Sequence, residues 1–118
     1  MPTTFSTKRF LISTTLVIAV GFATGLPAAA QDAKKGQTVY AAQKCQVCHA
    51  IAGTGNKTNP LDGVGGKLSA ADIKQWIVSP AEAAAKAKST KKPLMPNKYG
   101  SLPPADIDAL VAYMLSLK

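Results

Sequence analysis

The sequence of 118 residues contains few of the side chains from which most active sites are built. It has one histidine (His49), one tryptophan, two cysteines and six acidic residues, and Arg9 is its only arginine. The near absence of arginine and of aromatic residues interleaved with basic ones argues against a nucleic-acid-binding protein. No stretch alternates apolar and polar residues as a half-buried strand does. The length favours one domain and argues against a two-domain enzyme.

The first 30 residues differ in composition from the rest of the chain. All three phenylalanines lie here, no acidic residue does, and Lys8-Arg9 precede an apolar run over residues 10–26. Small residues end the stretch, so the pattern predicts a secretory signal peptide over residues 1–30, cleaved near Ala30. A retained membrane anchor is the alternative, but serine and threonine interrupt the run and it is short for a spanning helix. We therefore expect an exported mature chain, residues 31–118.

Both cysteines and the histidine lie in one motif, Cys45-Gln46-Val47-Cys48-His49. The pattern C-x-x-C-H is typical of c-type haem attachment. The chemistry needs this spacing, because two thiols add to the vinyl groups on one edge of the porphyrin and the imidazole that follows binds the iron. We predict one haem c, bound covalently through Cys45 and Cys48, with His49 as the proximal ligand.

The same residues allow other interpretations. A redox disulfide of the thioredoxin type would follow a strand in a βαβ unit, and the sequence shows no such unit. A structural disulfide between Cys45 and Cys48 would close so short a loop that it would stabilise the fold little. A tetrahedral zinc site needs four ligands, and the motif offers fewer. These alternatives stay open, although haem attachment accounts for the motif best.

On this motif, preceded by an export signal, the sequence resembles the small single-haem class I cytochromes c of the bacterial periplasm. The likeness covers nearly all of residues 31–118. It implies an all-α fold, with about four short helices wrapped around one covalently attached haem. It also implies a soluble, monomeric periplasmic protein that is not an enzyme and carries single electrons between a donor and an acceptor protein. The mature chain would not insert into a membrane.

Apolar periodicity and helix-start signals predict four helices, over residues 33–44, 69–78, 79–86 and 103–117. In the third, Glu82 and Lys86 are spaced as an i,i+4 ion pair. The glycine-rich stretch over residues 50–68 is predicted to be an irregular loop. The resemblance implies that Gly36 lets the first helix cross the last one closely, against Tyr113. Tyr40 lies five residues before Cys45, one more than the corresponding aromatic residue commonly does in the family.

Two further residues take roles from the resemblance. Pro60 follows Asn59 in a segment like the one whose proline carbonyl accepts the free N–H of the proximal histidine, a contact that fixes the imidazole. An ordinary turn proline is the alternative. Trp76 would donate its indole N–H to a haem propionate, as tryptophans do in some relatives, or else be satisfied within the core.

The other face of the iron requires a second ligand. Met114 lies on the apolar stripe of the last predicted helix and is predicted to pack in the core. Met95 lies between Pro93 and Pro96, in a segment that the two prolines keep non-helical and that resembles the distal loop of the family. We therefore expect Met95 to be the sixth ligand, oriented by Asn97 or Tyr99. An open site and a lysine ligand are the alternatives.

A histidine–methionine pair fills both axial positions, so oxygen and peroxide have no place to bind, and a thioether raises the reduction potential. These properties favour an electron carrier. A haem enzyme or gas sensor with an open or labile sixth site is the alternative function.

The chain carries a formal net charge of +8, from 14 basic and 6 acidic residues. Four of its lysines cluster just before the expected distal loop: Lys86, Lys88, Lys91 and Lys92. We expect them to form a docking surface for acidic redox partners. A solvated surface with no partner is the alternative.

Overall fold

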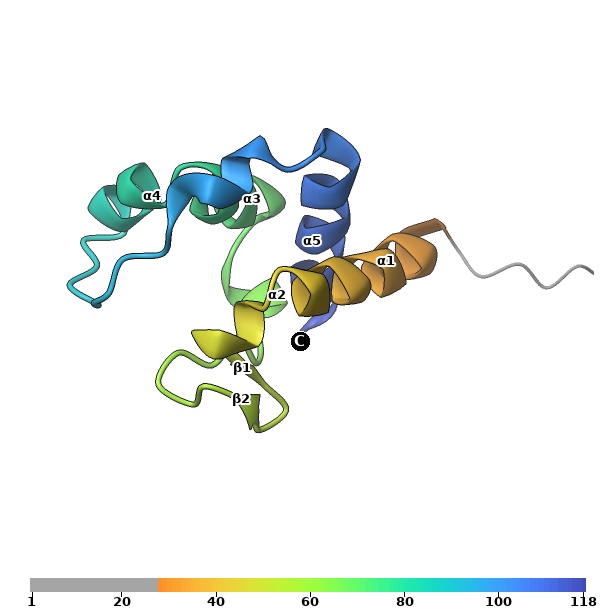
Figure 1. Cartoon of the computed structure of the whole chain (residues 1–118), viewed down its shortest axis with the longest axis horizontal. Helices are drawn as coiled ribbons and strands as arrows, with labels where there is room; N and C mark the ends of the chain where they lie inside the picture. The colour runs from red at the N-terminus through yellow and green to blue at the C-terminus, as the bar shows by residue number, and fades with distance from the viewer. Residues whose placement is uncertain (1–27) are drawn as a thin grey trace, which may run out of the picture.

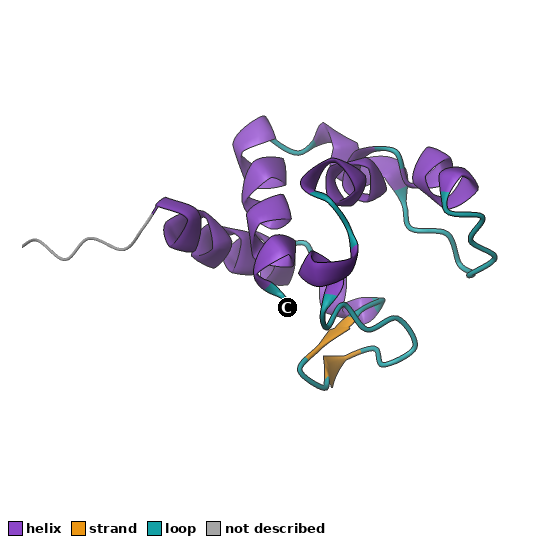
Figure 2. Cartoon of the chain, turned by 180° about the vertical axis from the view of Figure 1, so that it is seen from behind, coloured by secondary structure: helices purple, strands orange, loops and turns teal. Residues whose placement is uncertain are grey.

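The computed structural model describes residues 28–118 of the chain (Figure 1). Residues 1–27, which hold most of the predicted signal peptide, lie outside the described residues, and the cleavage near Ala30 stays a prediction. The elements follow in the order α1 (Ala28–Ala42), η1 (Cys45–Val47), β1 (Ala50–Ile51), β2 (Thr54–Gly55), α2 (Val64–Lys67), α3 (Ala70–Val78), α4 (Pro80–Lys86), η2 (Asn97–Ser101) and α5 (Pro104–Ser116). The fold is all-α, as the resemblance implied: Figure 2 shows helices joined by loops, and one small hairpin.

Local signals in the sequence explain where α3 and α4 begin. The Ser69 hydroxyl oxygen accepts a hydrogen bond from the backbone N–H of Asp72 at 3.1 Å, which caps the first turn of α3. Pro80 occupies the first position of α4, where its missing N–H costs nothing because that position has no acceptor within the helix. The predicted helices over 69–78 and 79–86 are therefore confirmed, with Ser69 and Ser79 as the residues that precede them.

Two elements inside the predicted loop over 50–68 are corrections to the sequence analysis. Strands β1 and β2 form an antiparallel hairpin in which Ala50 lies opposite Gly55 and Ile51 opposite Thr54. The turn between them contains Ala52 and Gly53 with positive φ angles of 50° and 78°, the backbone pattern that matches the twist of a two-residue hairpin. Strands this short contain no apolar alternation to be recognised in the sequence. The short helix α2 was also missed.

The core lies where α1 crosses α5 and α3 packs beside them (Figure 1). Its buried apolar side chains come from these three helices: Val39, Tyr40, Ile73, Ile77, Ile107, Leu110, Val111 and Met114. Met114 is only 6% exposed, so its predicted place in the core is confirmed. Among residues 28–118, no helix is both long enough and apolar enough to span a bilayer.

The crossing of α1 over α5 depends on Gly36. A Cβ atom at this position would lie 2.0 Å from the backbone oxygen of Ala109 and 2.6 Å from the Cβ atom of Tyr113. The rings of Tyr40 and Tyr113 meet edge to face next to this point, with centroids 5.8 Å apart and planes at 71°. The predicted pairing of Gly36 with Tyr113 is confirmed.

Candidate functional site

The Cys45–His49 motif lies on the turn that follows α1. Lys44 has the left-handed backbone conformation, with φ 57° and ψ 36°, so the chain leaves the helix there and enters η1. The Cys45 carbonyl accepts hydrogen bonds from the backbone N–H groups of Cys48 at 3.1 Å and His49 at 3.0 Å. This turn holds the backbone of the two cysteines and the histidine together around the Cys45 carbonyl. Both thiols are free; Cys45 is half-buried against the core, and Cys48 is exposed.

One nitrogen of the His49 ring has a fixed partner. Nδ1 lies 3.1 Å from the backbone carbonyl oxygen of Asn59. Since a carbonyl only accepts, Nδ1 must carry the proton in this contact, which leaves the lone pair on Nε2 for a metal. Burial is the largest cause that lowers the pKa of His49; the Asn59 carbonyl opposes this shift and the charge of Lys91 adds to it. Burial therefore favours the neutral imidazole, the form that binds iron.

The carbonyl that meets His49 belongs to Asn59 and not to Pro60, so the predicted acceptor was wrong by one residue. Ala50 and Pro60 pair as a single parallel bridge, in which the N–H of Ala50 donates to the Asn59 carbonyl at 3.3 Å and the N–H of Leu61 donates to the Ala50 carbonyl at 2.8 Å. Successive carbonyls point to opposite sides of an extended segment. The Asn59 oxygen therefore faces His49, and the Pro60 oxygen does not share that contact.

The carbonyl of His49 is also in contact with a side chain. The Tyr40 hydroxyl donates to it at 3.4 Å. Burial is the main cause that raises the pKa of Tyr40 to about 12, so this hydroxyl keeps its proton over the ordinary pH range. Helix α1 thus supports the motif through Tyr40, although this tyrosine lies one residue earlier than the family pattern suggests.

Met95 lies in the non-helical segment between α4 and η2, as predicted, and is half-buried. Residues on either side of Met95 act on the pKa values of the motif. Lys91 lowers the pKa of His49, and Lys98 lowers that of Cys45 against the larger effect of burial, which raises it. The thiols of the motif in turn raise the pKa of Tyr99, after burial. These effects fit a segment that lies near the motif, and Met95 as the sixth ligand stays a prediction.

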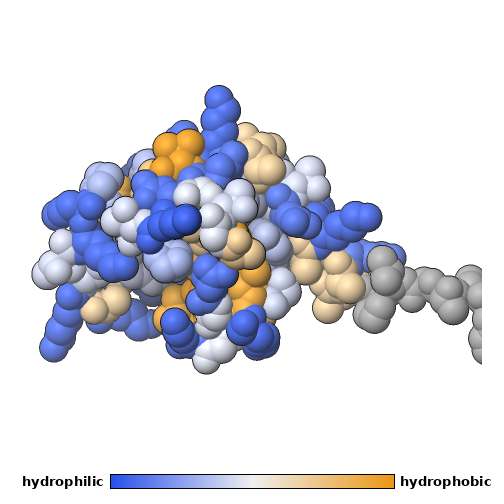
Figure 3. All heavy atoms as spheres, turned by 90° about the horizontal axis from the view of Figure 1, so that it is seen from below, coloured by the Kyte–Doolittle hydropathy of each residue, from blue (hydrophilic) through white to orange (hydrophobic). Residues whose placement is uncertain are grey.

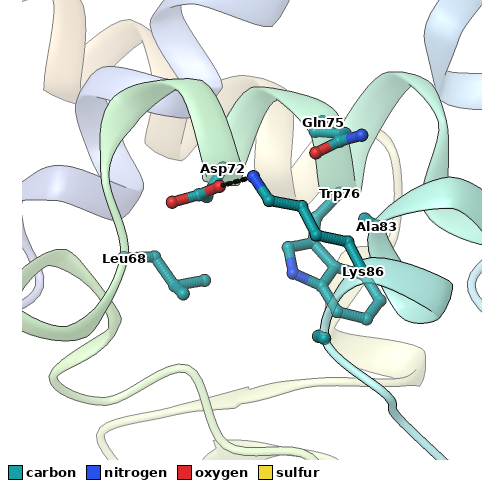
Figure 4. A pocket seen from close by; sticks show the side chains of 7 residues that line it. Leu68, Asp72, Gln75, Trp76, Ala83 and Lys86 are labelled. Atoms are coloured by element: carbon teal, nitrogen blue, oxygen red, sulfur yellow. Dashed lines mark hydrogen bonds and ion pairs between the residues drawn. The ribbon is translucent and has the colours of Figure 1, made fainter.

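A pocket lies beside Trp76, between α3 and α4 (Figure 4). Its volume is about 190 Å³, and it is lined by Leu68, Asp72, Gln75, Trp76, Ala83, Lys86 and Ala87. The indole of Trp76 is half-buried, and no hydrogen bond of its N–H is found among the described residues. A role for Trp76 toward a propionate therefore stays a prediction.

Lys86 is engaged differently from what the sequence indicated. Its ammonium group contacts the carboxylate of Asp72 at 2.7 Å, and not that of Glu82 one turn earlier in α4 (Figure 4). This contact, followed by that of Ser69, holds the pKa of Asp72 below its usual value. Lys86 thus belongs to an ion pair, whereas Lys88, Lys91 and Lys92 are exposed with no salt bridge in the described part of the chain.

The arrangement fits the haem that the motif predicts. Both thiols are free to form thioether bonds, and the imidazole beside them has its Nδ1 hydrogen-bonded and its Nε2 available. Seen from the side of β1 and β2, the surface is mostly hydrophilic with apolar atoms exposed between the charged groups (Figure 3). Large apolar side chains are exposed at Val47, within the motif, and at Leu94, next to Met95.

Comparison with known proteins gives one family. The family model described as Cytochrome c matches residues 33–118, which is most of the chain. No curated protein and no solved structure matches the sequence. The match begins in α1 and includes Cys45, Cys48, His49 and all of the helices that surround them. Together with the all-α fold and the C-x-x-C-H turn, it shows that the chain belongs to the cytochrome c family, as a small class I member that binds haem c.

Proposed function

We propose that this cytochrome c is a periplasmic one-electron carrier whose iron is held between His49 and Met95. The observation that carries the proposal is the hydrogen bond between His49 Nδ1 and the Asn59 carbonyl at 3.1 Å, which leaves Nε2 for iron beside two free thiols. The effects of Lys91 and Lys98 on the pKa values of His49 and Cys45 support a Met95 segment close to the motif. When bound, the haem supplies an iron that changes its charge by one electron. The predicted leader over residues 1–30 supports export to the compartment where c-type haem is attached.

Met95 is the better candidate for the sixth ligand because of where the two methionines of the described chain lie. Met114 is buried in α5 among the core residues, and its thioether packs against them. Met95 is half-buried on a segment flanked by Pro93 and Pro96, which restrict its backbone. A restrained thioether is suited to a metal whose ligands must move little between two oxidation states.

The chain's own residues favour electron transfer over catalysis. His49 has its Nδ1 bound to a carbonyl and its Nε2 assigned to iron, so it cannot act as a general base. Trp76, beside the Asp72–Lys86 pair, would donate its indole N–H to a propionate and so help to hold the haem edge. With Met95 on the remaining position, small ligands such as oxygen have no open coordination site.

Carbon monoxide tests the proposed function, because it binds only ferrous haem that has an open or labile position. We expect the absorption spectrum of the reduced protein to stay unchanged under carbon monoxide, and a redox titration to follow a single one-electron step. A spectral shift within seconds of adding carbon monoxide would instead favour the alternative, a haem enzyme or gas sensor.

We propose that redox partners dock on a basic surface formed by Lys88, Lys91, Lys92 and Lys98. The first three are exposed, and Lys98 lies over the Tyr99 ring at 5.1 Å and acts on Cys45. Lys98 replaces Lys86 in the surface that the sequence indicated, because Lys86 is paired with Asp72. Such a surface attracts an acidic partner over a distance and supports a brief contact of a monomeric carrier.

Charge reversal tests the docking surface. Lys91→Glu should slow reduction of the ferric protein by an anionic one-electron metal complex about three- to tenfold at low salt, because it removes local attraction. The difference should disappear near 1 M salt, where charges are screened beyond about 3 Å. Lys34→Glu is the matched control, since α1 extends away from the Met95 segment (Figure 1). Equal rates for the two variants at low salt would contradict a localised docking surface.

A further inference from the structure

Asn56, directly after β2, is in contact with most of the backbone of the haem-binding motif. Its backbone N–H donates to the carbonyls of Gln46 at 3.0 Å and His49 at 3.1 Å. Its side-chain amide nitrogen, Nδ2, donates to the carbonyl of Val47 at 3.2 Å. One residue outside the motif thus satisfies three of its carbonyl groups.

These carbonyls need partners from elsewhere in the chain. The last carbonyls of any helical turn have no N–H group ahead of them within the turn. In η1 the Cys45 carbonyl accepts from Cys48 and His49, and the N–H of Ala50 donates to Asn59, so the carbonyls of Gln46 and Val47 have no donor within the turn. Asn56 therefore acts as a cap on the carboxyl end of the turn that carries the cysteines.

Gly55 permits this approach. A Cβ atom at this position would lie 2.2 Å from the carbonyl oxygen of His49 and 3.0 Å from that of Gln46, and its φ of 104° is one that other residues rarely adopt. Strand β2 can come this close to the motif only with glycine there. Gly55 thereby allows the backbone N–H of Asn56, the next residue, to reach the carbonyls of the motif.

The same side chain also holds the segment that orients His49. The Asn56 Oδ1 atom accepts from the backbone N–H of Thr58 at 3.0 Å, which closes a tight turn. The next residue, Asn59, supplies the carbonyl that meets His49 Nδ1 at 3.1 Å. The Asn56 side chain therefore links two parts of the site. Its Nδ2 atom donates to the Val47 carbonyl, and its Oδ1 atom holds the turn that precedes Asn59.

We infer that Asn56 is a positioning residue for the axial imidazole: its amide fixes the motif relative to the Asn59 carbonyl and so sets the plane of the His49 ring. The residue does not touch the haem. The inference rests on the haem site assigned above and goes beyond electron carriage. An imidazole held by a hydrogen bond at Nδ1 keeps one orientation, so moving that acceptor should rotate the ring.

The test is the proton NMR spectrum of the ferric holoprotein, in which the ring-methyl shifts of the haem report the orientation of the axial ligands. Asn56→Asp keeps the oxygen that accepts from Thr58 but removes the donor to Val47. We expect it to change the spread of the methyl shifts. Thr58→Asp is the control, because it adds the same charge two residues away and leaves the amide of Asn56 in place. Its methyl shifts should match those of the wild type.

Thermal unfolding separates positioning from general stabilisation. The bond to Val47 is exposed, so Asn56→Asp should lower Tm by no more than about 5 °C. Asn56→Ala removes both side-chain bonds and should change the methyl shifts at least as far. Unchanged methyl shifts in Asn56→Asp, or equal changes in Thr58→Asp, would overturn the inference. Failure of the wild-type chain to carry covalent haem would contradict the haem site itself, which mass spectrometry of each sample decides.

Discussion

Gly36→Ala lowers the free energy of unfolding by about 3 kcal/mol, because the added methyl group has no room where α1 crosses α5. The new Cβ would lie 2.0 Å from the oxygen of Ala109 and 2.6 Å from its carbonyl carbon, which are backbone atoms and cannot rotate away. The helices must separate, and the edge-to-face contact of Tyr40 with Tyr113 is lost with them. In a domain of this size the loss corresponds to a fall in Tm of about 12–24 °C.

Gly66→Ala is the matched control for this substitution. Gly66 also lies in a helix, α2, but nothing is within 4 Å of the Cβ that alanine would add. Alanine costs less backbone entropy than glycine, so this variant should be more stable by about 0.5–1 kcal/mol. Denaturant unfolding of the ferric proteins measures both changes. A Gly36→Ala variant as stable as Gly66→Ala would show that the helices do not cross as closely as described.

Met95→Ala is expected to open the iron to carbon monoxide, whereas we expect the wild-type protein not to bind it. Removing the thioether leaves the sixth position without its proposed ligand, so the spectrum of the reduced variant should shift when the gas is added. The fold should change little, since Met95 is only half-buried and its segment is not part of the core cluster.

Met114→Ala separates this effect from loss of packing. Met114 is 6% exposed in α5, so truncation should lower the free energy of unfolding by about 2–5 kcal/mol through the cavity it leaves. Carbon monoxide should still not bind to this variant at a temperature where it is folded. The opposite pattern, with binding in Met114→Ala and none in Met95→Ala, would show that the two methionines have been assigned to the wrong roles.

The parts of the fold that could be predicted depend on signals within a few residues of each other. Ser69 and Pro80 determine where two helices begin, and the apolar spacing along α5 identifies its buried face. Glycine at position 36 could be paired with Tyr113 only through the resemblance to a family. The two cysteines and His49 were identifiable because the whole attachment chemistry is contained in five consecutive residues.

The parts that were missed depend on contacts between distant residues. The sequence favoured Glu82 as the partner of Lys86, but the fold brings Asp72 nearer, from the first turn of α3. Whether Asn59 or Pro60 faces His49 is decided by the alternation of carbonyls in an extended segment, so an error of one residue selects the wrong group. Asn56 gave no signal at all, because its partners are carbonyl groups of the backbone, which every sequence contains.

The account depends most on a methionine sulfur bound to the iron, and the absorption spectrum of the ferric protein tests this directly. The sample is the full chain of residues 1–118, expressed with a haem-attachment system, first oxidised and then reduced. We expect the weak long-wavelength band of a sulfur–ferric iron bond, which disappears on reduction. Attached haem without this band would mean that another group, or none, occupies the sixth position, and it would contradict the proposed carrier with His49 and Met95 as ligands.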